Sequence, residues 1–253
     1  MQPTNRPYCP SRFLLPLRRL LMASFVTLAS MPRHLTMSAR GAELDVPLAH
    51  TVGMYVTYGD DRTYTDVVDV TTPLDEAGAT TERGWIKADA FVTNISDIAL
   101  ILPVADCNAV VYADPVQNVI ALAHLGWHST VNDLAGQIVR HMVQVYGTDP
   151  ADILIYNSPS IRAESYIFTS LEQTPITHWH ELPYATPLDD GSYMVDLVKY
   201  NYDQWIQAGI RPQNIEIVDV DTAASPDYPS ARMGDASRFA VLAEIRPNTP
   251  SQD

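Results

Sequence analysis

The chain has 253 residues, of which 46% are hydrophobic and 18% charged, and this composition excludes a mainly disordered protein. The formal net charge of −14 is unevenly distributed. Residues 1–42 carry six arginines and no acid, and the rest holds the other 10 of the 16 basic side chains against all 30 acidic ones, a charge of −20. This acidic body excludes nucleic-acid polymers as partners, because phosphate-binding surfaces need Lys and Arg to displace counterions.

The basic segment 1–42 contains an apolar stretch, Leu20–Met31, that follows Arg18 and Arg19. Its length suits the apolar region of a signal peptide and is too short to span a bilayer. An amphipathic first helix and a tail added by an upstream start codon are the alternatives. The two cysteines, Cys9 and Cys107, are too few for a disulfide-stapled secreted domain. We therefore expect a cytoplasmic protein without a membrane-spanning segment, and export is the minority alternative.

The central part of the chain is predicted to be rich in strands. Short apolar runs predict strands over 90–93, 99–104, 109–113 and 119–123. The last two runs are joined by a turn over 114–118 that contains Pro115, which predicts a β-hairpin. A further strand is expected over 153–156.

Two helices are predicted in the second half. The first begins at Thr130 or Asn132 and ends at Gly147, on an apolar stripe formed by Val131, Leu134, Ile138, Val139, Met142 and Val145. The second spans 196–208 and ends at Gly209, and strands over 215–220 and 239–245 follow it. This irregular alternation favours an α+β fold. We expect one domain over residues 43–246 and a disordered tail over 247–253.

Cys107 and His124 form the candidate site. Cys107 comes just before the first hairpin strand, and His124 comes at the end of the second, so the hairpin should bring them together. A thiolate and an imidazole are either zinc ligands or a nucleophile with its general base.

The sequence around this pair resembles a known family. Residues 104–130, VADCNAVVYADPVQNVIALAHLGWHST, are similar to the "ADC … DP … AHAGW" signature of the YfiH / multicopper polyphenol oxidase (laccase-domain) family. Four further segments match the family's motifs in order, over 88–94, 158–168, 195–217 and 228–245. The resemblance implies a layered α/β/β/α domain with mixed sheets.

The resemblance also implies a zinc ion held by two histidines and one cysteine. Cys107 and His124 match two of these ligands. His50 matches the third, in LAHTVGMYVTYGDD (48–61), although Leu48 replaces the family's Gln. A competing alignment to Arg40–Gly41 leaves the site without this ligand. Three protein ligands leave one position open, as in catalytic zinc sites.

The implied activity is that of a purine nucleoside phosphorylase with adenosine deaminase activity, acting on adenosine, inosine and methylthioadenosine-type nucleosides. Its small-molecule partners are the nucleoside and phosphate. We predict Asp106 and Arg232 as catalytic residues, with Asp106 either bonded to a ligand histidine or solvated in a turn. Other candidates are the phosphate-binding arginines Arg162 and Arg238, and the purine-stacking aromatics Trp127, Tyr156 and Tyr166.

Several departures from the family motifs favour alternatives. The turn over 158–168 has lost two glycines, at Ser158 and Arg162, and two cysteines, at Glu164 and Ser165, and the family's later "CT" reads Asp221–Thr222. The chain could therefore be a catalytically inactive binding or scaffold protein, or a cysteine hydrolase with Cys107 as nucleophile and His124 as base. Copper is less favoured than zinc, because no further His/Met cluster supplies a multicopper site. The sequence indicates no oligomeric state.

Overall fold

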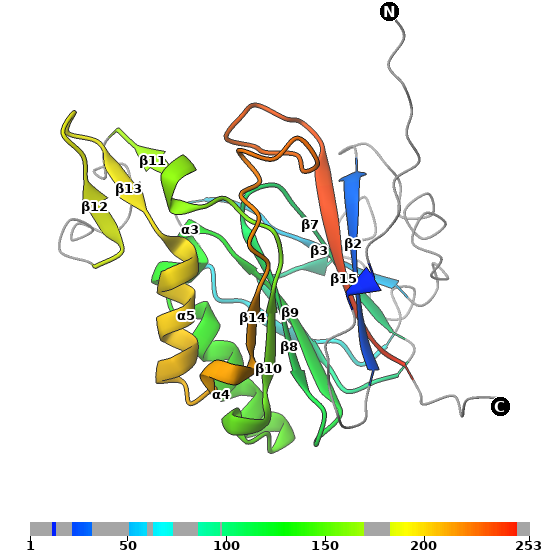
Figure 1. The fold of residues 1–253 in the computed structure, drawn as a ribbon. Coiled ribbons are helices and arrows are strands. Elements are labelled where there is room, and N and C mark those ends of the chain that lie inside the picture. The colour runs from blue at the N-terminus through cyan, green and yellow to red at the C-terminus, as the bar shows by residue number, and fades with distance from the viewer. Residues whose placement is uncertain are drawn as a thin grey trace, which may run out of the picture.

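The computed structural model describes residues 12–13, 22–31, 51–59, 63–72, 86–96, 98–169 and 183–246. The strands form two six-stranded sheets (Figure 1). The first sheet has the order β1 (Arg12–Phe13), β2 (Met22–Met31), β15 (Arg238–Arg246), β7 (Ala99–Val104), β3 (Thr51–Tyr55) and β5 (Ile86–Lys87). The second sheet has the order β14 (Ile215–Ile217), β10 (Leu154–Asn157), β8 (Asn108–Asp114), β9 (Val119–Leu125), β6 (Ala90–Thr93) and β4 (Val67–Asp69).

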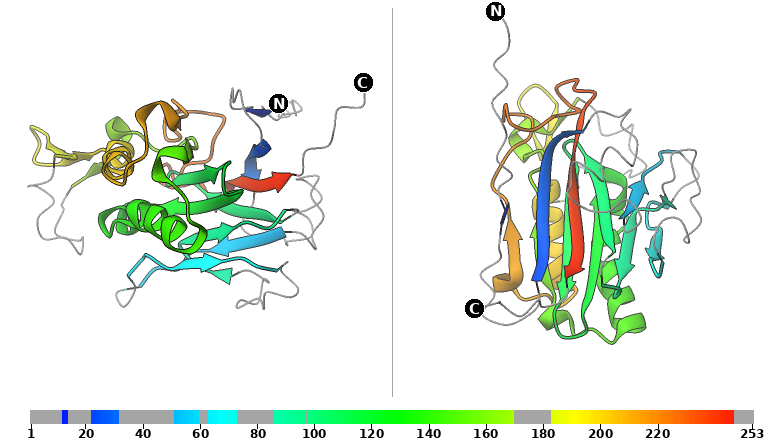
Figure 2. Two further views of the ribbon diagram at one scale, coloured as in Figure 1. Left: turned by 90° about the horizontal axis from the view of Figure 1, so that it is seen from below. Right: turned by 90° about the vertical axis from the view of Figure 1, so that its right-hand side faces the viewer.

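The described helices cover one face of the second sheet. They are α3 (Trp127–Val131), α4 (Leu134–Tyr146) and α5 (Leu197–Gln207), and Figure 2 shows them gathered on one side of the strands. A small sheet of β11 (Ile167–Phe168), β13 (Tyr193–Val195) and β12 (Ala185–Pro187) lies beyond them. Single 3₁₀ turns occur at Pro150–Asp152, Ala163–Ser165 and Pro212–Asn214. The predicted α+β class is confirmed, and the second helical layer that the resemblance implied is not among the described residues.

Two hydrophobic cores follow from the alternation of side chains along the strands. In β9, Ile120 and Leu122 face the first sheet, where they pack with residues of β7 and β15. Their neighbours Ala121 and Ala123 face the helices, where they pack with Ile138 and other residues of α4. By the same alternation, His124 and Cys107 lie on the side that faces the first sheet. The site is therefore at one end of the core between the two sheets.

The predicted hairpin is confirmed, since β8 and β9 pair antiparallel from Asp114↔Val119 to Asn108↔Leu125. The strand predictions over 90–93, 99–104, 153–156 and 239–245 also agree with the structure to within a residue or so. The strand predicted over 215–220 ends earlier, at Ile217. The second helix is confirmed, with Asp196 as its N-cap and Gly209 at a φ of 99° just beyond its end.

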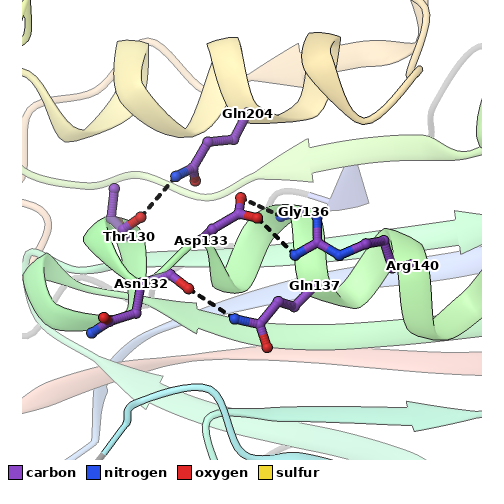
Figure 3. A network of polar contacts seen from close by, with 7 residues as sticks. All are labelled: Thr130, Asn132, Asp133, Gly136, Gln137, Arg140 and Gln204. Atoms are coloured by element: carbon purple, nitrogen blue, oxygen red, sulfur yellow. Dashed lines mark hydrogen bonds and ion pairs between the residues drawn. The ribbon is translucent and has the colours of Figure 1, made fainter.

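The first predicted helix is broken in two, so the prediction of Thr130 or Asn132 as its N-cap is wrong. Asn132 ends α3, and Asp133, with a φ of 58°, caps α4 through a bond that its carboxylate accepts from the Gly136 amide at 3.3 Å. The Thr130 carbonyl accepts a bond from Gln204 of α5 at 2.8 Å. Figure 3 shows this junction, in which short polar contacts join all three helices. The predicted end at Gly147 is confirmed, but Val145 is 54% exposed.

Asp133→Ala should lower the free energy of unfolding by about 2 kcal/mol. Loss of the cap costs about 1 kcal/mol, and alanine in the left-handed region costs about 1 kcal/mol more. The exposed ion pair with Arg140, at 2.7 Å, adds little. Urea unfolding measures the change, and Asp133→Asn, which keeps an acceptor and tolerates positive φ, is the matched control. Equal losses in the two variants would contradict this account.

The helical prediction for the N-terminal segment is wrong, because Met22–Met31 is a strand that pairs antiparallel with β15. An apolar run of this kind is compatible with either structure, and pairing with a buried strand decides between them. These residues belong to the first sheet, although they lie before the predicted domain start at residue 43. The rest of segment 1–42 and the tail over 247–253 lie outside the described residues. No helix in the described part of the chain has the length and apolarity to cross a membrane.

Candidate functional site

Cys107 and His124 border the same small space. Cys107 ends the turn that joins β7 of the first sheet to β8 of the second, and His124 lies in β9 opposite Ala109. A Cβ atom built on Gly126 would lie 3.2 Å from Cys107 Sγ and 3.5 Å from His124 Nε2. Both potential ligand atoms therefore face the space that the missing side chain of Gly126 leaves free. A thiol sulfur and an imidazole nitrogen are donors that zinc accepts, so these residues could supply two of its ligands.

The backbone of His124 is fixed on both sides. Its amide donates to the carbonyl of Asp89 at 2.9 Å, and its carbonyl accepts a bond from Ser129 Oγ at 2.7 Å. Asp89 is fully buried, and its carboxylate accepts a bond from the Asp66 amide at 3.0 Å. Asp89 was not predicted from the sequence, where its only signal is an acidic residue inside the apolar run 88–93. These contacts fix the backbone at His124, the residue whose imidazole lies beside Gly126.

His50, the predicted third ligand, lies outside the described residues. The next residue, Thr51, pairs in parallel with Ala99, the first residue of β7, whereas Cys107 lies beyond the last residue of that strand. At roughly 3.3 Å per residue, the two ends of β7 are about 17 Å apart. Within the described ranges, no group of three His, Cys, Asp or Glu side chains could hold a metal ion. The prediction of His50 as a ligand therefore gains no support from its neighbours.

Burial keeps the Cys107 thiol protonated in the absence of a cation. Desolvation raises its pKa to about 12, repulsion from Asp106 acts in the same direction, and Arg238 opposes both. A thiol of this kind is a poor nucleophile, because the thiolate is the reactive form. A bound cation would reverse the shift, since a coordinating thiol is deprotonated. The environment therefore favours the ligand interpretation of Cys107 over the cysteine hydrolase alternative.

Aromatic side chains pack against one another in the segments that follow β3 and β9. Tyr64 stacks on His128 with ring centroids 4.3 Å apart, and Tyr58 lies 6.5 Å from the His128 ring. Trp127 stacks on Phe168 at 5.1 Å. Of the predicted stacking residues, Trp127 and Tyr166 are partly buried, whereas Tyr156 is 1% exposed and packs in the core between the sheets. Tyr156 is therefore not available to stack on a ligand.

Asp106 is a buried residue that joins three loops, so its prediction as a solvated turn residue is wrong. Its carboxylate accepts bonds from the Thr222 hydroxyl and from the Arg232 amide, each at 2.7 Å. Its carbonyl accepts a bond from the Ile161 amide at 2.8 Å. Asp106 also has a φ of 80°, which Asp tolerates better than most residues. These contacts hold the turn that carries Cys107, and the predicted catalytic role of Asp106 stays a prediction.

Asp106→Ala should lower the free energy of unfolding by about 2–4 kcal/mol. The change leaves the Thr222 hydroxyl and the Arg232 amide without their acceptor, and alanine at this positive φ adds strain. Asp106→Asn keeps the shape and tolerates the backbone, so it should lose less. Chemical denaturation of both variants checks the order, and a stable Asp106→Ala chain would show that the carboxylate does not hold the loops.

The three candidate arginines differ in placement. Arg232 lies over the rings of Tyr166 and Phe168, 4.9 and 5.2 Å from their centroids, and also donates to the Ile167 carbonyl. Arg238 lowers the pKa of Cys107, so its charge acts on the site. Arg162 instead donates to the Val218 carbonyl, and burial lowers its pKa. Arg232 and Arg238 are therefore better placed for phosphate than Arg162.

The altered turn is stabilised by residues that depart from the family motifs. The Ser165 hydroxyl donates to the Asp221 carboxylate at 2.5 Å, and the Arg162 amide donates to the same carboxylate at 3.2 Å. Ser158 is fully buried, and its hydroxyl accepts a bond from the Ala109 amide at 3.2 Å. Ser165 and Arg162 thus share one acceptor, and Ser158 bonds separately to the backbone of β8.

The fold and the site define an α+β domain with a thiol–imidazole pair where a β-hairpin ends, between two packed sheets. The chain belongs to the family described as multi-copper polyphenol oxidoreductase laccase, which matches residues 42–245. This confirms the resemblance seen in the sequence. Two solved structures share the fold, each with a TM-score of 0.70: Bacillus licheniformis hypothetical protein YfiH (22% identity, covering 89% of this chain and 93% of that one) and YlmD from Geobacillus stearothermophilus (20%, 90% and 92%).

Curated relatives carry functional names. The chain is 27% identical over 173 residues to purine nucleoside phosphorylase YlmD of Bacillus subtilis, and the aligned region covers 66% of this chain and 61% of that protein. It is 31% identical over 159 residues to purine nucleoside phosphorylase LACC1 of Mus musculus, and the aligned region covers 60% of this chain and 36% of that protein. The match thus spans about three fifths of the first relative and about a third of the second.

Proposed function

We propose that this chain is a zinc-dependent purine nucleoside phosphorylase that also deaminates adenosine. The observation that carries the proposal is the space beside Gly126, which Cys107 Sγ and His124 Nε2 share. The names of the curated relatives support the choice of purine nucleosides and phosphate as substrates. The reaction fits a cytoplasmic protein, as the sequence predicts.

Phosphorolysis breaks the bond between the purine and ribose C1′. A phosphate oxygen forms the new bond to C1′, the bonding electrons leave with the purine, and a proton neutralises the purine nitrogen. In deamination, water adds at C6 of adenosine and ammonia leaves, which gives inosine. A bound zinc ion supplies Lewis acidity for a phosphate or a water at neutral pH.

The residues around the pair divide the remaining tasks. Cys107 and His124 would hold the ion, and the backbone of His124 is fixed by the hairpin and by the contacts to Asp89 and Ser129. Arg232 and Arg238 supply positive charge near the site in an otherwise acidic body. The partly buried ring of Trp127, next to Gly126 in the chain, is the candidate on which a purine would stack.

The test is an assay of the purified chain with adenosine, inosine or methylthioadenosine, with and without phosphate. Release of free base that requires phosphate, and of inosine from adenosine without it, is the expected result. His124→Ala should abolish both reactions. Arg162→Lys is a control that should retain them, because the Arg162 side chain donates to the Val218 carbonyl. Stoichiometric zinc without turnover of any nucleoside would overturn the proposal.

Two outcomes would favour the alternatives. Nucleoside binding without turnover would identify an inactive binding or scaffold protein, for which the altered turn over 158–165 is the motivation. Hydrolysis that persists in the metal-free chain and is lost on alkylation of Cys107 would identify the cysteine hydrolase. Copper-dependent phenol oxidation, which the family description suggests, is the less favoured activity. One thiol and one imidazole do not supply the ligands of a multicopper site.

A further inference from the structure

We propose that Tyr58 is the third protein group at the Cys107–His124 pair, so that this site combines a thiol, an imidazole and a phenol. The inference rests on the proposed function, since it concerns how the same site holds a metal ion. It replaces the imidazole that the family pattern implies with a different donor.

The order of the strands carries the first step. β3 runs parallel to β7, with Thr51 beside Ala99 and Gly53 beside Ile101. The chain leaves β3 after Tyr55 at the same end of the first sheet at which it leaves β7 for Cys107. Residues that follow β3 are therefore delivered to the end of the first sheet from which the chain passes to Cys107. Tyr58 is three residues beyond the end of β3.

The surroundings of Tyr58 carry the second step. Its ring lies 6.5 Å from the ring of His128 and 6.3 Å from that of Tyr64. His128 is the second residue of α3, whose N-cap is Gly126, the residue beside the thiol and the imidazole. Tyr64 is held nearby because its hydroxyl donates to the Gly59 carbonyl at 2.9 Å and accepts from the Gly59 amide at 3.0 Å. Tyr58 is thus on the rim of the site, and 67% of its surface is exposed.

Tyr166 is the alternative phenol, and its ring already has partners. It carries the guanidinium of Arg232, 4.9 Å from its centroid, and meets Phe168 edge-on at 4.7 Å. Tyr58 has the more accessible side chain and is therefore the one we assign.

The consequence is a change in metal retention. A phenol oxygen is a harder donor than imidazole nitrogen, so the set of Cys107, His124 and Tyr58 should hold zinc less tightly than a set with two histidines. Restoring an imidazole at position 58 should therefore tighten zinc binding, and removing the hydroxyl should weaken it.

The experiment measures zinc affinity of the full chain by competition with a chromogenic chelator. We expect Tyr58→Phe to weaken binding by about tenfold or more and Tyr58→His to tighten it by a similar factor. Tyr55→Phe, another exposed tyrosine at the end of β3, is the matched control and should not change the affinity. Cobalt absorption adds a second readout, because the sulfur-to-cobalt band should persist in Tyr58→Phe while the ligand-field bands change.

Unchanged zinc affinity in both Tyr58 variants would overturn the inference, and so would a wild-type chain that binds neither zinc nor cobalt. Loss of zinc affinity in Tyr58→Phe without turnover of any nucleoside by the wild type would support the inference while the proposed function fails. The two proposals are thus tested separately.

Discussion

Cys107→Ala should remove bound zinc and abolish nucleoside phosphorolysis. The loss of zinc affinity should exceed the roughly 10–100-fold that removal of a group outside the ligand shell costs. The sulfur is the softest donor beside Gly126, and alanine leaves His124 Nε2 without a second ligand from the hairpin. Zinc per chain after dialysis, measured by atomic absorption, and phosphate-dependent base release check both effects.

The metal-free variant should stay folded, which separates loss of the site from loss of the fold. The protonated thiol of Cys107 behaves as a small apolar group, so its truncation in the metal-free chain should cost about 1 kcal/mol. Cys9→Ala removes the other cysteine, which lies outside the described residues, and should leave zinc content and activity unchanged. Full zinc content in Cys107→Ala would show that the thiol is not a ligand.

Trp205→Ala should cause the largest loss of stability, about 3–5 kcal/mol. Trp205 is fully buried between α5 and the second sheet, and its indole N–H donates to the Tyr112 hydroxyl at 2.9 Å. The two rings meet edge-on at 6.4 Å. Because domains of this kind are stable by about 5–15 kcal/mol, the loss should move the urea midpoint substantially.

A double-mutant cycle separates packing from the hydrogen bond. Trp205→Phe keeps an aromatic ring but leaves the buried Tyr112 hydroxyl without this donor, at a cost of about 1–3 kcal/mol. Adding Tyr112→Phe removes the hydroxyl, so the double variant should recover part of that loss. Strict additivity would show that the contact between Trp205 and Tyr112 contributes nothing of its own.

The hairpin and its Cys107–His124 pair could be predicted because they depend on local pattern. Two apolar runs joined by a short turn fix which strands pair, and the length of the turn fixes their register. Pairing of distant strands leaves no such signal. The sequence motif pointed to His50, but the parallel pairing of β3 with β7 delivers the residues after β3 to the site. Tyr58 could be placed only once that pairing was known.

Two further differences have local causes. The first helix breaks at Asp133 because this residue adopts a left-handed conformation and caps a new helix, which an apolar stripe alone does not reveal. In the sequence, the loss of glycine and cysteine in the turn over 158–165 favours an inactive relative. In the structure Asp221 accepts bonds from Ser165 and Arg162, so the departures act together.

The site also lies across the boundary between the two sheets. His124 lies in β9 of the second sheet and Cys107 directly precedes β8 of the same sheet, whereas Tyr58 follows β3 of the first. An ion bound by all three would act as a cross-link between the layers, and at 100 times its dissociation constant it would stabilise the folded chain by about 2.7 kcal/mol. Chelation should therefore lower the melting temperature. It should also speed amide hydrogen exchange first at the end of β9 that carries His124 and in the segment that follows β3.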